Sequence, residues 1–254
     1  LAGLVLRVAL WKLRWINPDE GAHLLDARLL LQGLAPVADF GSRQPFYVWV
    51  ISLFIRVFGV SVHAARWMPI LASLGTSAVL FLIGRRLFSA THGLVAAALY
   101  TFLPLTLIWS AVVKTEPLAI LLGTLAVLFV VKTYQDKRSL FIVVAAVFAG
   151  LAFYVRQPTL YLPMAIGLFI LTHSFRRWRH VLMFIGGYAA VVLVMFGVYH
   201  FHMSLQDFLF SQLNPLHLIW NRTLHLFGAL PAEYRITDSG EFRVLDQDLN
   251  YTFR

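Results

Sequence analysis

The sequence predicts an all-α, polytopic helical membrane protein. We expect about seven spans, the first of them truncated, and an amphipathic interfacial helix in the first outer loop. The composition is 59% hydrophobic and only 13% charged, whereas soluble domains usually carry about 25% charged residues. The mean hydropathy is +0.75, and several apolar runs approach the roughly 20 residues that cross a bilayer. These values exclude an ordinary soluble enzyme and a disordered chain, and the lack of Cys excludes a thiolate metal site.

The apolar stretches define the expected helices in chain order. Residues 1–15 have the character of a span cut off at its start, so we expect a fragment of a longer protein. Residues 44–58 are short and include Arg56, which favours an interfacial or re-entrant helix. The full candidate spans are residues 62–83, 94–113, 117–131, 140–155, 158–172 and 181–199.

The basic residues predict the orientation, because cytoplasmic loops of membrane proteins are enriched in Lys and Arg. Three short loops hold eight bases and one acid, Asp136, for a net charge of +7 out of +9 for the chain. We therefore place these loops in the cytoplasm and the alternate loops outside. The basic character thus sets topology and does not indicate nucleic acid as a partner. The bases are Arg85, Arg86, Lys132, Lys137, Arg138, Arg176, Arg177 and Arg179.

Two regions are expected. Residues 1–200 form the transmembrane core, with a long outer loop at 16–61, and residues 201–254 form an outward-facing loop or the start of a further, truncated region. Binding and catalytic residues concentrate on loops held by a rigid scaffold. We therefore expect function on the outer side, where the longest loops lie.

The first outer loop contains a helix start at residues 17–20, Asn-Pro-Asp-Glu. Asn is a good N-cap, Pro suits the first helical position, and Glu20 fits a capping-box variant. If Glu20 bonds back to the cap, Asp19 remains for other chemistry. The alternative is that both acids only complement the helix dipole. His23 is expected to be an interfacial polar residue.

Three further outer segments carry charges at the ends of spans. Lys114 and Glu116 share one turn, Arg156 lies in a second, and Arg43 precedes the interfacial helix. Charged residues near membrane depth indicate function, although a local Lys114–Glu116 ion pair is the alternative. Together with Asp19, these residues predict an outward site with two separated carboxylates and several bases, which suits a phosphate-bearing ligand.

Other polar residues give weaker signals. Arg56 and Arg66 are ambiguous, and extension to lipid head groups is one interpretation of both. No metal-ligand spacing links His200, His202, His217 and His225, so no metal site is predicted among them. A divalent cation joining the two outer carboxylates stays an open alternative.

The ordered motifs of the chain resemble those of the C-type glycosyltransferases. The resemblance is closest to the branch of protein O-mannosyltransferases and lipid A aminoarabinose transferases. It rests on Asn-Pro-Asp-Glu-Gly at 17–21, the Leu-rich segment 24–33, Arg-Gln-Pro-Phe-Tyr at 43–47, Gly-Arg-Arg-Leu-Phe at 84–88, Thr-Glu-Pro at 115–117 and Arg-Gln-Pro at 156–158.

The resemblance implies an enzyme whose active site lies at the outer membrane face. It would take a sugar linked to a polyprenyl phosphate and transfer it, with inversion, to a hydroxyl of a protein, lipid or glycan. Besides these substrates it implies membrane lipids as partners, a bacterial or archaeal cell membrane as location, and no required cofactor, because phosphate is already a leaving group.

The resemblance also implies roles for individual residues. The catalytic candidates are Asp19, as general base, with Glu116 and Glu20. The candidates for contacting the donor phosphate are Arg43, Arg156, Lys114 and Tyr47.

Two other function classes stay open at this point. A transporter or flippase for an anionic lipid or solute would place ionisable residues near mid-span and use broken helices. The charges here cluster at span ends, which favours the enzyme. In a non-catalytic membrane scaffold, the acids at residues 19 and 20 would only cap a helix.

Overall fold

The computed structural model of the chain describes residues 1–13, 18–36, 39–40, 42, 44–173 and 177–200, with two short strands at 234–236 and 242–244. The chain divides into two compact units, Leu1–Phe208 and Leu209–Arg254. The predicted division of roles, a core at 1–200 and an outward region at 201–254, stays a prediction.

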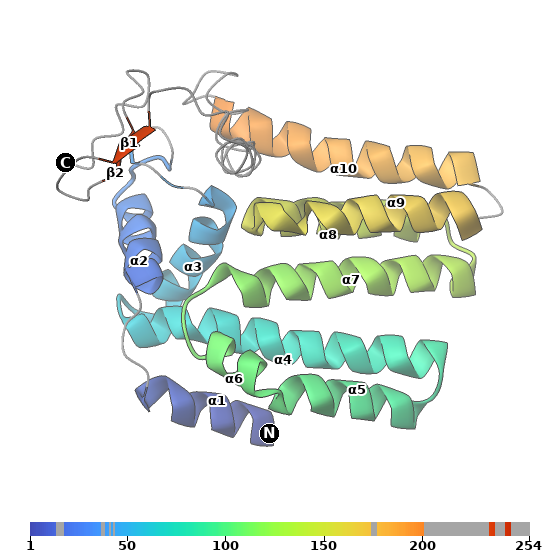
Figure 1. Cartoon of the computed structure of the whole chain (residues 1–254), viewed down its shortest axis with the longest axis horizontal. Helices are drawn as coiled ribbons and strands as arrows, with labels where there is room; N and C mark the ends of the chain where they lie inside the picture. The colour runs from blue at the N-terminus through green and yellow to red at the C-terminus, as the bar shows by residue number, and fades with distance from the viewer. Residues whose placement is uncertain are drawn as a thin grey trace. The chain divides into compact units, whose positions relative to one another are not determined.

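The first unit is helical, which confirms the predicted fold class (Figure 1). Every stretch expected to span the membrane is largely helical in the structure. The elements are α1 (Ala2–Leu13), α2 (Pro18–Leu31), α3 (Pro45–Phe58), α4 (Val62–Leu87), α5 (Ala90–Phe102), α6 (Pro104–Ser110), α7 (Thr115–Asp136), α8 (Leu140–Val155), the 3₁₀ turn η1 (Gln157–Leu160), α9 (Tyr161–His173) and α10 (Arg177–His200).

Fewer of these helices are long enough to cross a membrane than the seven expected. Within the described residues, α4, α7 and α10 have the length and hydropathy of spans. The predicted span at 94–113 is broken into α5 and α6, which meet at 60° and would make a fourth span if taken together. Pro104 begins α6 and lacks the N–H that a continuous helix needs. The 16 residues of α8 cover about 24 Å, less than the roughly 30 Å hydrocarbon core.

The long helices lie side by side, and α2 and α3 gather at one end of them (Figure 1). At this end α4 and α7 begin and α8 ends, so the turns expected on the outer side do lie on a common side. The helix α3 is more than an interfacial helix, because Tyr47, Val48 and Ile51 on its inner face are fully buried. They join one apolar core with residues of α2, α4, α7 and α8.

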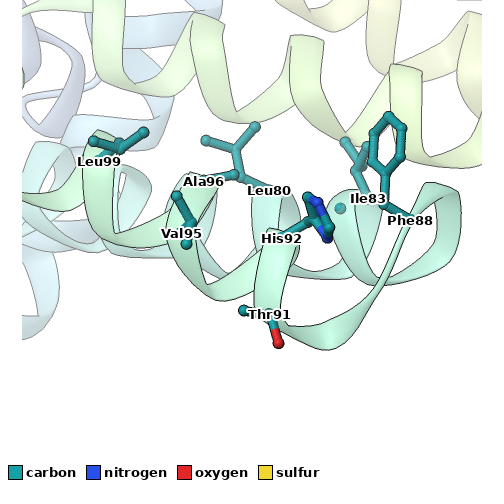
Figure 2. A pocket seen from close by; sticks show the side chains of 9 residues that line it. Leu80, Ile83, Phe88, Thr91, His92, Val95, Ala96 and Leu99 are labelled. Carbon is teal, nitrogen blue, oxygen red and sulfur yellow. The ribbon is translucent and has the colours of Figure 1, made fainter.

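At the other end, α4 and α5 approach so closely that glycine is required. A Cβ on Gly84 would lie 2.6 Å from the Cα of Gly93, and a Cβ on Gly93 would collide with the carbonyl oxygen of Phe81. An apolar groove opens beside this contact (Figure 2), and Leu80, Ile83, Phe88, His92, Val95 and Leu99 are among the residues that line it. The groove lies far along α4 from α2 and α3, and we give it no role in the chemistry.

The second unit contains a small antiparallel sheet. Strand β1 (Tyr234–Ile236) pairs with β2 (Phe242–Val244) in the register Tyr234↔Val244, Arg235↔Arg243 and Ile236↔Phe242.

Candidate active site

The first candidate carboxylate, Asp19, forms an ion pair with Lys114. The Lys114 Nζ lies 3.0 Å from Asp19 Oδ2 and 4.4 Å from the centre of the Trp109 ring. Lys114 is the N-cap residue of α7 and Trp109 belongs to α6, so two consecutive helices supply the ammonium group and the ring beside it. The Asp19 side chain is 64% exposed, whereas that of Lys114 is only 15% exposed. The ammonium group is thus held between a ring and a carboxylate that is open to solvent.

The second candidate carboxylate, Glu116, pairs with Arg156. A guanidinium nitrogen, Nη1, lies 2.7 Å from Glu116 Oε1 and donates to the Thr115 hydroxyl at 3.3 Å. Glu116 lies in the first turn of α7 and Arg156 caps the C-terminus of α8. Each charge therefore has the sign that the adjacent helix dipole favours. Both side chains are partly exposed, Arg156 at 38% and Glu116 at 28%.

The local Lys114–Glu116 pair considered from the sequence is wrong. Each residue pairs with a charge from a different element, Lys114 with α2 and Glu116 with the end of α8. Neighbouring residues around a helix start point in different directions, so each faces a different partner. The two carboxylates and two cations thus come from three separate segments.

His23 and Tyr47 lie beside these charges. Their ring centres are 4.8 Å apart, at 72° to one another. Burial lowers the pKa of His23, with Lys114 acting in the same direction and the carboxylates of Asp19 and Glu116 opposing it. Imidazole is therefore neutral at neutral pH. The sequence predicted His23 only as an interfacial polar residue and did not indicate its contact with Tyr47.

The hydroxyl group of Tyr47 is buried and makes no hydrogen bond to any described residue. The side chain is fully buried, and its oxygen has no hydrogen-bond partner among the described residues. Burial raises the pKa of Tyr47 well above its usual value, and the nearby carboxylates of Glu116 and Glu20 raise it further. The phenol therefore stays protonated and can act as a hydrogen-bond donor.

Glu20 forms a buried ion pair with Arg66 of α4. The Arg66 Nε and Nη2 each donate at 2.8 Å to one oxygen of the carboxylate. The backbone N–H of Val113 donates to Glu20 Oε1 at 2.9 Å, and Arg66 also donates to the carbonyl of Trp11. The interpretation in which Arg66 extends to lipid head groups is wrong, because its side chain is 2% exposed. An arginine inside an apolar span is costly, and that signal could have prompted a search for its acid.

Residues 42–200, more than half of the chain, match the family described as dolichyl-phosphate-mannose-protein mannosyltransferase. The chain belongs to this family. It is therefore a membrane glycosyltransferase of a class that uses lipid-phosphate-linked sugars, which confirms the resemblance seen in its motifs. No curated protein and no solved structure matches the chain.

The matched region of the chain includes most of the predicted site. Tyr47 and the residues of the turns at 114–116 and 156–158 lie inside it, whereas Asp19 and Glu20 precede it. Arg43, predicted to contact the donor phosphate, and Asn17, the expected helix cap, lie outside the described residues. The capping box therefore stays a prediction, although both Glu20 oxygens already accept other hydrogen bonds. In the searched part of the chain, no group of three or more His, Asp or Glu side chains could hold a metal.

Proposed function

We propose that the protein transfers a glycosyl group, with inversion, from a polyprenyl-phosphate donor to a hydroxyl acceptor at the outer membrane face. The observation that carries this proposal is a set of two ion pairs between different elements, Asp19–Lys114 at 3.0 Å and Glu116–Arg156 at 2.7 Å. They bring two carboxylates and two cations to the end of the helices where a lipid-linked phosphate would arrive. The outward orientation is inferred from the basic loops.

Lys114 and Arg156 are the proposed contacts for the donor phosphate. A phosphodiester is singly charged, and the phosphate monoester that departs gains a second negative charge as the glycosidic bond breaks. Fixed cations at this position stabilise the developing charge. Arg43 is proposed to join them from the segment before α3, as the motif resemblance implies. Arginine suits this task because its planar fork binds phosphate oxygens in pairs.

Lys114 and Arg156 are each paired with a carboxylate in the structure. Donor binding would therefore replace these carboxylates with the phosphate as the partner of each cation. Exposed ion pairs contribute only about 0.2–1 kcal/mol, and the phosphate can therefore displace them at small cost. When Lys114 turns to the phosphate, its ion pair with Asp19 is broken. Donor binding would thus remove the Lys114 ammonium group from the proposed base before the acceptor binds.

Asp19 is the proposed general base. The acceptor oxygen attacks the anomeric carbon from the side opposite the phosphate, its proton passes to the Asp19 carboxylate, and the bonding electrons leave with the phosphate oxygen. Such proton transfer accelerates reactions by about 10²–10⁴-fold. Asp19 suits this role because it is 64% exposed and lies at the start of a helix, where a soluble or protein acceptor can reach it.

The remaining candidates take supporting roles in this proposal. Glu116 orients Arg156 through their ion pair. The Tyr47 hydroxyl, unpartnered among the described residues, is available to donate to an oxygen of the donor. Glu20 is buried and paired with Arg66, so we assign it a structural role in place of the catalytic one first considered.

The test uses the full-length protein in proteoliposomes with dolichyl-phosphate mannose as the first donor. Ser/Thr peptides, a lipid hydroxyl and an oligosaccharide serve as acceptors, and NMR reads the anomeric configuration of the product. Formation of an inverted glycoside with release of dolichyl phosphate would support the proposal. Movement of the donor across the vesicle without any glycoside, or a product with retained configuration, would overturn it.

A further inference from the structure

We propose that Arg66 is a positioning residue of the active site, fixing the register in which Lys114 meets Asp19. This inference rests on the proposed function, because it concerns the residues assigned to donor binding and proton transfer. Arg66 acts through Glu20, whose carboxylate it binds and which in turn accepts a hydrogen bond from the Val113 N–H.

The Arg66–Glu20 ion pair is bidentate and buried, so it holds α2 and α4 in a fixed relative orientation. Two parallel N–H···O bonds of 2.8 Å join the guanidinium to both carboxylate oxygens, and the side chains are 2% and 0% exposed. A bidentate pair fixes the angle between its partners as well as their distance. The helix α2 is thus oriented on α4 by two bonds that water does not reach.

The same carboxylate also holds the segment before α7. The N–H of Val113 donates to Glu20 Oε1 at 2.9 Å, and Val113 immediately precedes Lys114. Glu20 in turn immediately follows Asp19. Two adjacent contacts therefore join the same two segments. The contact between Glu20 and Val113 is buried, and the contact between Asp19 and Lys114 is partly exposed.

The buried contact, and not the exposed one, sets the register. An ion pair between partly exposed side chains is weak and screened by salt, so Asp19–Lys114 cannot hold two segments in place. A buried carboxylate needs its cation, because an unpaired charge in the interior is strongly unfavourable. Arg66 also donates to the carbonyl of Trp11, so α1, α2 and α4 meet at its guanidinium, and the α6–α7 connection joins them through the Glu20 carboxylate.

Arg66→Lys tests the role directly, since lysine keeps the charge but loses the planar fork. Arg56→Lys is the matched control, because Arg56 is an exposed arginine on the neighbouring helix α3. We expect Arg66→Lys to lower kcat by about 10- to 100-fold, as a misplacement near 1 Å can do, while Arg56→Lys leaves it unchanged. In the Arg66→Lys background, Lys114→Met should cost less than in the wild type.

A double variant, Glu20→Gln with Arg66→Met, tests the same role if Arg66→Lys alone fails to fold. It removes both charges together, so no unpaired charge stays buried, while the Gln oxygen can still accept from Val113. All kinetic values are taken on the monodisperse fraction after size exclusion. If both Arg66 variants fold and turn over like wild type, or only the folded yield falls, the positioning role is refuted.

A distance measurement separates this inference from the proposed function. The chain has no Cys, so spin labels can be attached at Cys introduced in place of the exposed Ala22 on α2 and Ile120 on α7. We expect a narrow distance distribution in the unmodified background and in Arg56→Lys, and a broad one in Arg66→Lys and in the double variant. An unchanged distribution in both Arg66 variants would overturn the inference whether or not sugar transfer is detected. A wild-type protein without any transfer would refute the proposed function alone.

Discussion

Asp19→Asn should abolish most of the transfer activity and leave the fold intact. The Asp19 side chain is 64% exposed, so its ion pair with Lys114 contributes only about 0.2–1 kcal/mol to stability. Loss of a general base lowers kcat by about 10²–10⁴-fold, which corresponds to about 2.7–5.4 kcal/mol of activation free energy at 1.36 kcal/mol per tenfold change. The catalytic effect should therefore exceed the effect on stability several times over.

The adjacent acid provides the internal control. Glu20 is 0% exposed and is paired with Arg66, so Glu20→Gln leaves a buried guanidinium without its counter-charge. Breaking a buried ion pair in this way costs about 3–5 kcal/mol, a large part of the roughly 5–15 kcal/mol that stabilises a typical protein. Two isosteric substitutions at consecutive positions should thus have opposite outcomes, one in activity and one in stability.

The assay measures kcat with saturating dolichyl-phosphate mannose in proteoliposomes, and the unfolding midpoint by intrinsic fluorescence in detergent. Asp19→Asn should unfold within a few degrees of the wild type, and Glu20→Gln well below it. Wild-type turnover in Asp19→Asn would refute the assignment of the base. A fall in its midpoint as large as that of Glu20→Gln would refute the reasoning from exposure.

Three further outcomes are expected. Arg156→Met should raise the donor KM about 10- to 100-fold, because a hydrogen bond to a charged group is worth about 1.5–3 kcal/mol; an unchanged KM, with Arg56→Met as control, would contradict this. Tyr47→Phe should stabilise the protein by about 1 kcal/mol, since a buried hydroxyl without a partner is costly, yet weaken donor binding; a lower unfolding midpoint would count against it. The pKa of His23 is lowered from 6.5 in the folded state, so the unfolded chain binds its proton first and stability is lost as the pH falls below about 6.5. The unfolding midpoint should therefore fall less on acidification in His23→Gln than in the wild type, and equal falls would refute this.

Hydrophobic length predicted the helices correctly, because it is a local property of the chain. Each apolar stretch became helical, and the charged turns expected on one side do lie at one end of the helices. Within the described residues, fewer helices have the length of a span than the seven expected, since apolar runs show where a helix forms but not whether a proline divides it. The break at Pro104 turned one expected span into two helices bent by 60°.

The charge partners could not be predicted in the same way. Local reasoning offered a Lys114–Glu116 pair and an Arg66 that extends to the lipid as alternatives, and the structure contradicts both. Arg66 meets Glu20 across 46 positions of the chain, and Val113 meets the same carboxylate across 93. Such pairings depend on which helix faces pack together, and no motif of a few residues carries that information.

By itself, the sequence determined an all-helical membrane glycosyltransferase with several acids and bases in the turns at one end of its helices. Apolar length and loop charge act within a few residues, and the ordered motifs identify the family. Only the tertiary structure decided which of two consecutive acids, Asp19 and Glu20, is accessible and which is buried. The physical reason is that a helix presents neighbouring residues in different directions, so the packing of α2 on α4 left Asp19 exposed and placed Glu20 against Arg66.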